Sequence, residues 1–234
     1  MAEFNGSGRA DGFPPAVEGW ETFNDFTMSM KIDARYFRSD GGERFLQEVL
    51  ASCKTREVGL PKGRILWRVR SGGVSLKVYI GDADMRGIIY KSRPHPRCGM
   101  KPLRINWRSE GRVNQRGISY LYLATNLNTA LADVRPWIGL IVSVERFEVV
   151  GNLKVIDCSD LDDRMMMLFD SGNTSIREDG IWVGIDRAFA EPVGRDDDVA
   201  AYVPTQMLAE VFKVNGYDGL IDKSFLVVAH LSPV

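Results

Sequence analysis

The chain has 234 residues, of which 44% are hydrophobic and 26% charged, which suits one globular domain with a sizeable core. Its 30 basic and 31 acidic residues give a formal net charge of −1, which argues against a protein that binds nucleic acid directly through a global positive surplus. Three widely spaced cysteines and two histidines offer neither a disulfide framework nor a zinc-ligand spacing, so we expect reduced thiols and no metal site.

The N-terminal part predicts a flexible tail over residues 1–20, because this stretch is rich in Gly, Pro and Ala. It lacks the basic start and apolar core of a signal peptide, and no apolar run approaches the roughly 18 residues of a membrane span. We therefore expect a cytoplasmic protein without membrane contact.

A helical segment is expected over residues 21–60, packed on a main domain that occupies residues 61–234. Within it, residues 43–52 carry an apolar stripe at helical spacing, formed by Phe45, Leu46, Val49 and Leu50.

Strand patterns begin after the turn signal at residues 61–63. Residues 64–70 alternate, so that Leu66, Arg68 and Arg70 share one face of a predicted strand. Two arginines on one strand face indicate either a solvated edge or an anion site. Residues 91–117 are rich in Gly, Pro, Arg and Lys and predict a basic loop region.

The next stretch predicts a strand followed by a helix. Residues 118–125 read as a strand with Tyr120 and Tyr122 on one face, and Asn126 offers a helix start. That helix, which carries Asp133, should stop before Pro136.

Residues 140–150 and 153–158 read as two strands joined by the turn Gly151-Asn152, which predicts a hairpin. Residues 160–200 show no regular pattern. Pro204 begins a further helix that ends at Asn215-Gly216, and residues 217–225 form a short buried strand leading to Ser224. Strands and helices alternate without a regular βαβ repeat, and neither GxGxxG nor GxxxxGK[ST] occurs, so a Rossmann or Walker phosphate loop is not supported.

Eight polar or aromatic residues on these elements form a candidate site: Arg68, Arg70, Arg112, Arg116, Tyr120, Tyr122, Asp133 and Ser224. Arginine forks suit phosphate, aromatic faces suit a flat cationic heterocycle, and a carboxylate suits ribose hydroxyls. The combination fits a dinucleotide with a positively charged ring. The alternative is ordinary solvated charges and core aromatics, because such residues occur in every globular protein.

Motifs in four segments resemble the longer subgroup of the RES-domain family, in the family's order and over about residues 60–224. They are LWRVR, GRVNQRGISYLYLA, TALADVRP and YVPTQMLAEVF followed by GYDGLI-DKS. The resemblance implies an α+β fold, with an ADP-ribosyltransferase-like, split and mainly antiparallel β-sheet core surrounded by helices. It also implies an NAD-degrading toxin of a toxin–antitoxin system, with NAD as substrate, no cofactor, and a helix-turn-helix antitoxin as partner.

The resemblance matches Arg68, Arg112, Tyr122 and Ser224 to family positions, while Asp133 stands where the family has glutamate. It implies cleavage of the nicotinamide–ribose bond by water or inorganic phosphate. Asp133 would stabilise the ribosyl cation, and Arg68 and Arg112 would bind the diphosphate. Tyr122 would pack near the nicotinamide, and Ser224 would hydrogen-bond the substrate or position an arginine, while Arg70, Arg116 and Tyr120 are further substrate-binding candidates.

The aspartate leaves three interpretations open: an enzyme whose backbone compensates, an attenuated enzyme, or an altered form with damped toxicity. Among functions, a form that binds NAD without cleaving it is a further alternative. Mono-ADP-ribosyltransfer to a protein is another.

Overall fold

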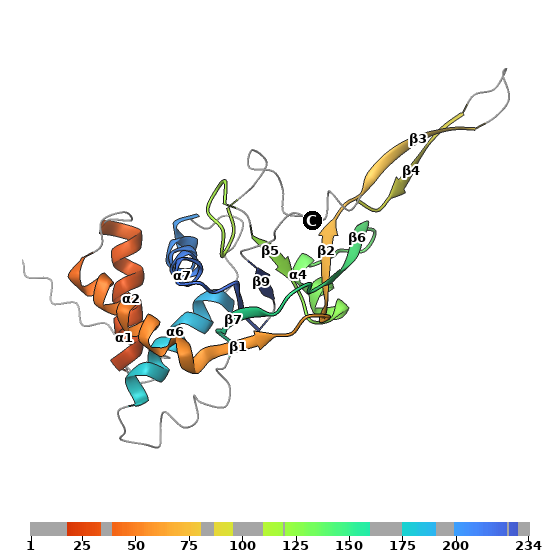
Figure 1. Cartoon of the computed structure of the whole chain (residues 1–234). Coiled ribbons are helices and arrows are strands. Elements are labelled where there is room, and N and C mark those ends of the chain that lie inside the picture. The colour runs from red at the N-terminus through yellow and green to blue at the C-terminus, as the bar shows by residue number, and fades with distance from the viewer. Residues whose placement is uncertain are drawn as a thin grey trace, which may run out of the picture.

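The computed structural model has an α+β fold with a mainly antiparallel sheet, as predicted (Figure 1). It describes residues 18–33, 39–80, 87–95, 110–118, 120–159, 175–190, 199–223 and 225–228. The main helices are α1 (Glu18–Met28), α2 (Asp40–Ser52), α4 (Leu127–Val134), α6 (Ser175–Ala190) and α7 (Val203–Val214). The strands are β1 (Glu57–Leu60), β2 (Ile65–Ser71), β3 (Val74–Ile80), β4 (Gly87–Arg93), β5 (Leu121–Leu123), β6 (Val142–Glu148), β7 (Leu153–Asp157), β8 (Gly219–Ile221) and β9 (Leu226–Val228).

The sheet is split into a five-stranded part, in the order β1-β7-β8-β9-β5, and two antiparallel pairs, β2–β6 and β3–β4. Among the described strands, β7 and β8 pair in parallel and all other neighbours pair antiparallel. Trp67 of β2 and Ala124 exchange two backbone hydrogen bonds of 2.8 Å, which join the β2–β6 pair to the edge strand β5.

The predicted hairpin between residues 140–150 and 153–158 is wrong. β6 pairs with β2 and β7 pairs with β1, and both pairs keep one register across the facing connections 61–64 and 149–152. In these connections the Gly63 amide donates to the Val149 carbonyl at 2.8 Å. The turn is thus a bend in a long two-stranded ribbon, and turn residues alone do not distinguish a bend from a hairpin loop.

The two faces of the five-stranded sheet pack against different hydrophobic clusters. Neighbours on β7, Val155 and Ile156, point to opposite faces, as side chains on a strand must. Ile156 faces the cluster formed with α1, α2, α6 and α7, whereas Val155 faces a cluster enclosed by strands. The strand-enclosed cluster consists of Leu60, Leu66, Leu121, Leu123, Val149, Val155, Leu226 and Val228.

The helical side differs from the prediction in three places. The helix α6 lies in a stretch that was expected to be irregular. It was not predicted because two glycines and the buried Asp186 interrupt its apolar stripe. Gly184 of α6 lies so close to α1 that an added Cβ would come within 2.7 Å of the Phe23 ring. The helix α1 begins at Glu18, inside the expected tail, and β1 occupies the last four residues of the expected helical segment. The predicted stripe on α2 is confirmed, with Phe45, Leu46 and Val49 buried.

The β3–β4 hairpin was not predicted, and it takes residues 91–93 from the expected basic loop. It projects away from the rest of the fold (Figure 1). The buried Ser143 hydroxyl holds its base, because it donates to the Gly72 carbonyl and accepts from the His95 amide, each at 2.8 Å.

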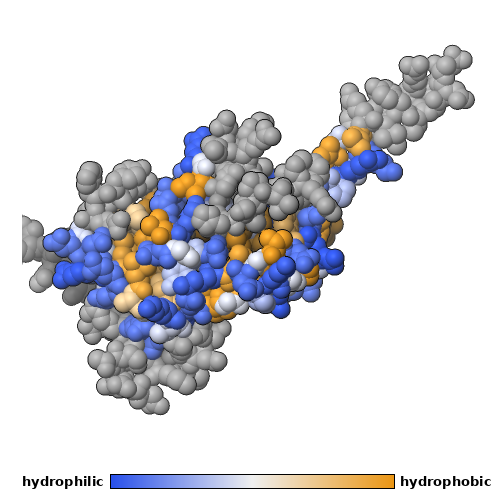
Figure 2. Space-filling model, in the orientation of Figure 1, coloured by the Kyte–Doolittle hydropathy of each residue, from blue (hydrophilic) through white to orange (hydrophobic). Residues whose placement is uncertain are grey.

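Hydrophilic side chains cover much of the described surface in the view of Figure 2, with apolar patches between them. No helix in the described part of the chain is long and apolar enough to cross a membrane.

Candidate active site

A short helix places Asp133 beside the β2–β5 junction. Asn126 caps α4, since its side-chain oxygen accepts from the Thr129 amide at 2.8 Å, which confirms the predicted start. The helix ends at Val134 before Pro136, with Arg135 in the left-handed region at φ 47°, so the predicted stop is also confirmed. The inner face of α4 packs on β2 through a small cluster centred on Val69, Ala124 and Ala130.

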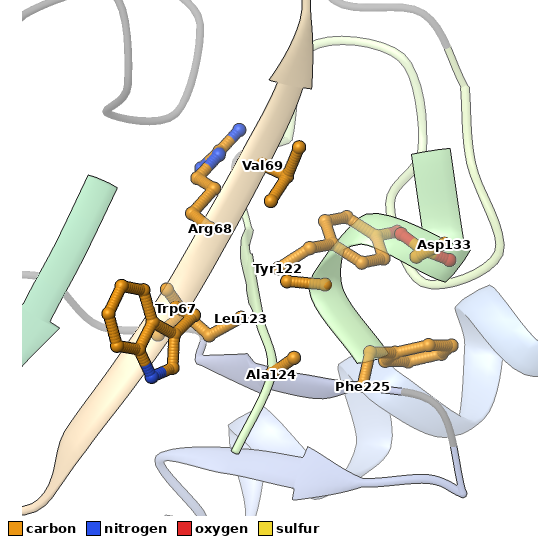
Figure 3. Close-up of a pocket in the computed structure, with 9 residues that line it drawn as sticks. Trp67, Arg68, Val69, Tyr122, Leu123, Ala124, Asp133 and Phe225 are labelled. Carbon is orange, nitrogen blue, oxygen red and sulfur yellow. The ribbon is translucent and has the colours of Figure 1, made fainter. Parts of the chain in front are cut away.

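Three of the predicted site residues, Arg68, Tyr122 and Asp133, line one pocket (Figure 3). The other lining residues are Trp67, Val69, Leu123, Ala124, Ala130 and Phe225. The empty space in the pocket and at its mouth amounts to about 380 Å³, part of which is open to solvent. Its walls come from segments far apart in the sequence: β2, the strand β5, the helix α4 and the residue that precedes β9.

Arg68 provides a partly buried positive charge with unused hydrogen-bonding capacity. Its Nη1 atom is buried and has no hydrogen-bond partner among the described residues. Burial, reinforced by repulsion from Arg70, lowers the pKa of Arg68 from 12.5 to about 10, although the Tyr122 phenol opposes this change. A buried donor without a partner is costly for the fold, so the arrangement suits an anion that would supply the missing acceptor.

Tyr122 uses its hydroxyl inside the protein and presents its ring to the pocket. The hydroxyl accepts from the Val113 amide at 3.1 Å and donates to the Asn114 Oδ1 atom at 2.8 Å. Burial raises the pKa of Tyr122 well above 10, so the phenol is neutral at physiological pH. Its ring packs against Phe225 with centroids 5.6 Å apart. Tyr122 therefore offers an aromatic face rather than an acid.

Asp133 lies at an exposed position of α4, yet its carboxyl group lines the pocket. Partial burial of that carboxyl raises its pKa above 3.8, while the charges of Arg112 and Arg135 act in the opposite direction. In Figure 3 the phenol oxygen of Tyr122 lies on the side of the ring that faces Asp133. An aromatic surface and a carboxylate therefore share one end of the pocket.

Arg112 is not among the residues that line the pocket, but it contacts Phe225, which is. Its Nη1 atom donates to the Phe189 carbonyl at 2.8 Å, near the C-terminus of α6. Its guanidinium carbon lies 5.5 Å from the Phe225 ring centroid, a cation–π distance. Because its charge acts on both Asp133 and Tyr122, Arg112 belongs to the electrostatic environment of the site.

Arg70, Arg116 and Tyr120 do not line this pocket. Arg70 is close enough to lower the pKa of Arg68, whereas Arg116 is exposed. Tyr120 is buried and lines a different hollow, where Lys213 lies 5.5 Å from its ring centroid. Burial and the charge of Glu210 raise the pKa of Tyr120 to about 12.

Ser224 lies outside the described residues, as does Cys98, one of the three cysteines expected to be reduced. The sequence analysis missed Phe225 and Trp67 as pocket residues. Both are neighbours in sequence of predicted site residues, and that proximity is the signal that could have found them.

Comparison with known proteins gives one assignment. The family model described as RES domain matches residues 66–231, from the start of β2 to beyond β9. Comparisons with curated proteins and with solved structures gave no match. The family match covers well over half of the chain and includes all eight predicted site residues. The chain belongs to the RES domain family, a family linked to NAD-related toxin activity.

Proposed function

We propose that the chain is an NAD-consuming toxin that cleaves the nicotinamide–ribose bond, with water or inorganic phosphate as the acceptor. The observation that carries the proposal is the partly buried Arg68, whose buried Nη1 has no partner among the described residues, in one pocket with Asp133 and Tyr122. Membership of the RES domain family supports it. The proposal also includes an antitoxin with a helix-turn-helix domain that inhibits this chain, and it places the cleavage of NAD in the cytoplasm.

In this proposal the diphosphate of NAD binds at Arg68. Arg70 adds positive charge next to it, as the lowered pKa of Arg68 indicates. Among the described residues Arg112 donates one of its five N–H groups, to the Phe189 carbonyl, and its other donors are proposed to bind the substrate. Ser224 is proposed to hydrogen-bond the substrate or to position one of these arginines, and Arg116 remains a candidate contact outside the described pocket.

The chemical step breaks the bond between the anomeric carbon and the nicotinamide nitrogen, and the bonding electron pair leaves with nicotinamide as a neutral product. Positive charge therefore develops on the ribose, as in glycoside hydrolysis. The carboxylate of Asp133 stabilises that charge. The pyridinium packs against the Tyr122 ring, which is itself supported by the Phe225 ring. Water or phosphate then attacks the anomeric carbon, and an attacking water loses its proton to solvent.

The side chain of Asp133 is one methylene shorter than that of glutamate, and this difference should affect the rate of cleavage. An aspartate places its oxygens roughly 1–1.5 Å further back than glutamate on the same backbone, and a misplacement of about 1 Å costs on the order of a hundredfold in rate. We therefore propose that the wild type cleaves NAD slowly and that glutamate at position 133 would raise this rate.

Incubation of the purified protein with NAD tests the proposal, with free nicotinamide measured in the presence and absence of phosphate. ADP-ribose as the second product indicates hydrolysis, and its 1-phosphate ester indicates phosphorolysis. Label transferred from NAD to a protein indicates an ADP-ribosyltransferase instead. The variant Arg68→Met should release nicotinamide at least tenfold more slowly, whereas Arg146→Met, at an exposed position of β6, should match the wild type. Equal release by all three proteins contradicts the assigned site.

A further inference from the structure

The N-terminal turn of α7 holds the backbone turn 111–114 that carries Arg112. The amide nitrogen Nε2 of Gln206 donates to the Gly111 carbonyl at 2.9 Å and to the Asn114 carbonyl at 3.1 Å. The Thr205 hydroxyl lies 2.6 Å from the Arg112 carbonyl, closer than its alternative acceptor, the Tyr202 carbonyl at 2.9 Å. Three carbonyls of a four-residue turn therefore face two side chains of one helix.

The turn is compact and has little freedom to adjust. The Gly111 amide donates to the Asn114 carbonyl at 3.0 Å and closes the turn. A Cβ atom at Gly111 would lie 2.8 Å from the Asn114 Oδ1 atom and 3.2 Å from the Tyr122 hydroxyl. The Tyr122 hydroxyl holds the other side of the turn through Val113 and Asn114. The turn is thus fixed between the sheet and α7.

The helix α7 is a rigid support for these contacts. Thr205 and Gln206 are 2% and 4% exposed, so their hydrogen bonds are shielded from competing water. Leu208, Ala209 and Phe212 on the same helix belong to the main hydrophobic cluster. A shift of the turn relative to α7 would leave buried donors and carbonyls without partners, at a cost for each.

We propose that Gln206 and Thr205 are positioning residues that aim Arg112 at the NAD-binding pocket. This inference rests on the proposed function. The guanidinium of Arg112 contacts the Phe189 carbonyl and the Phe225 ring. The direction of the Arg112 side chain therefore depends on the position of the turn that carries it. A side chain at 206 must donate two N–H bonds to hold both carbonyls, which excludes apolar side chains of equal size and an ionised glutamate.

The test compares Gln206→Met and Thr205→Val, which keep the approximate volume and remove the donors, with Thr205→Ser, which keeps the hydroxyl. Val214→Ala, at an exposed position near the end of α7, is the matched control. We expect the KM for NAD to rise about tenfold in Gln206→Met and several-fold in Thr205→Val, with smaller changes in kcat. Thr205→Ser and Val214→Ala should stay close to the wild type. A merely structural role predicts a lower folded fraction, hence a lower apparent kcat with unchanged KM, and that result would overturn the inference.

A double-mutant cycle separates action through Arg112 from general damage. If Gln206 works by aiming Arg112, then Arg112→Met/Gln206→Met should have the same KM as Arg112→Met alone. Fully additive effects in two folded variants overturn the inference.

Calorimetric titration with ADP-ribose keeps this result separate from the proposed reaction. A wild type that releases no nicotinamide but binds ADP-ribose, with weaker binding in Gln206→Met, contradicts the reaction and retains the positioning role. A wild type that neither turns over NAD nor binds ADP-ribose contradicts both.

Discussion

Replacing Arg68 by methionine should stabilise the fold and weaken ligand binding at the same time. In the wild type, burial and the charge of Arg70 disfavour the protonated guanidinium and lower its pKa from 12.5 to about 10. A group whose pKa falls on folding destabilises the folded state at every pH at which it stays protonated. A depression of this size corresponds to about 3 kcal/mol of folding free energy at neutral pH.

Methionine removes the charge and the unpartnered Nη1 donor but retains an unbranched apolar stem for packing against the pocket wall. For a chain of this length each kcal/mol moves Tm by roughly 2–4 °C, so the upper limit of the gain is a rise of roughly 6–12 °C. Thermal unfolding followed by circular dichroism measures it, with Arg146→Met as a control that should leave Tm unchanged because that side chain is exposed.

The same experiment with a ligand provides the refuting outcome. A bound anion supplies an acceptor for Arg68, so saturating ADP-ribose should raise the Tm of the wild type by mass action and leave that of Arg68→Met nearly unchanged. A variant that is less stable than the wild type, and that ADP-ribose still stabilises equally, would refute the reasoning. That result would mean that Arg68 is satisfied inside the protein and does not contact the ligand.

Four further predictions concern the other pocket residues. In Asp133→Asn nicotinamide release should be lost while Tm is no lower than in the wild type, because burial raises the pKa of this carboxyl and its ionised form therefore costs stability above that pKa. For the same reason the acid limb of the wild-type pH–rate profile should lie above pH 3.8, and a limb at or below that value contradicts an essential role for this carboxylate. In Asp133→Glu kcat should rise at least about tenfold, since a carboxylate about 1 Å out of place costs on the order of a hundredfold; an unchanged kcat would mean that the backbone already compensates. Tyr122→Phe leaves the Val113 amide and the Asn114 side chain without their shared partner, so the free energy of unfolding in a urea titration should fall by about 1–3 kcal/mol; no loss would mean that water replaces the hydroxyl.

The elements that the sequence predicted correctly are those whose limits are set by local chemistry. The Asn126 cap and Pro136 define α4 because a cap and a proline act on the residues next to them. Gly216, at φ 85°, follows the end of α7 for the same kind of reason. Local signals of this kind need no knowledge of the rest of the fold.

The errors concern partners that are distant in sequence. The strand β6 pairs with β2 rather than β7 because of the apolar faces that meet in the strand-enclosed core. The turn residues alone do not predict this pairing. The helix α6 was missed because its Gly184 is explained by close contact with Phe23 of α1, and its buried Asp186 pairs with Lys223, and both partners are distant in sequence. Tyr120 and Tyr122 share a strand pattern, yet the two rings line different hollows.

The charges in the pocket show that the properties of the site depend on how its residues come together in space, and not only on their presence in the sequence. Arg68 and Asp133 line one pocket, but among the described residues no ion pair joins them, and burial is the largest cause of both pKa changes. A direct ion pair would push the two pKa values apart, raising that of the arginine and lowering that of the aspartate. Here the opposite holds, since the pKa of Arg68 is lowered and that of Asp133 is raised. Neither charge neutralises the other, so each is available to a separate group of a ligand. Under the proposed function NAD would supply both partners, an anionic diphosphate and a ribosyl group that becomes cationic as nicotinamide leaves, so relief of the cost of burying these two charges would favour the transition state.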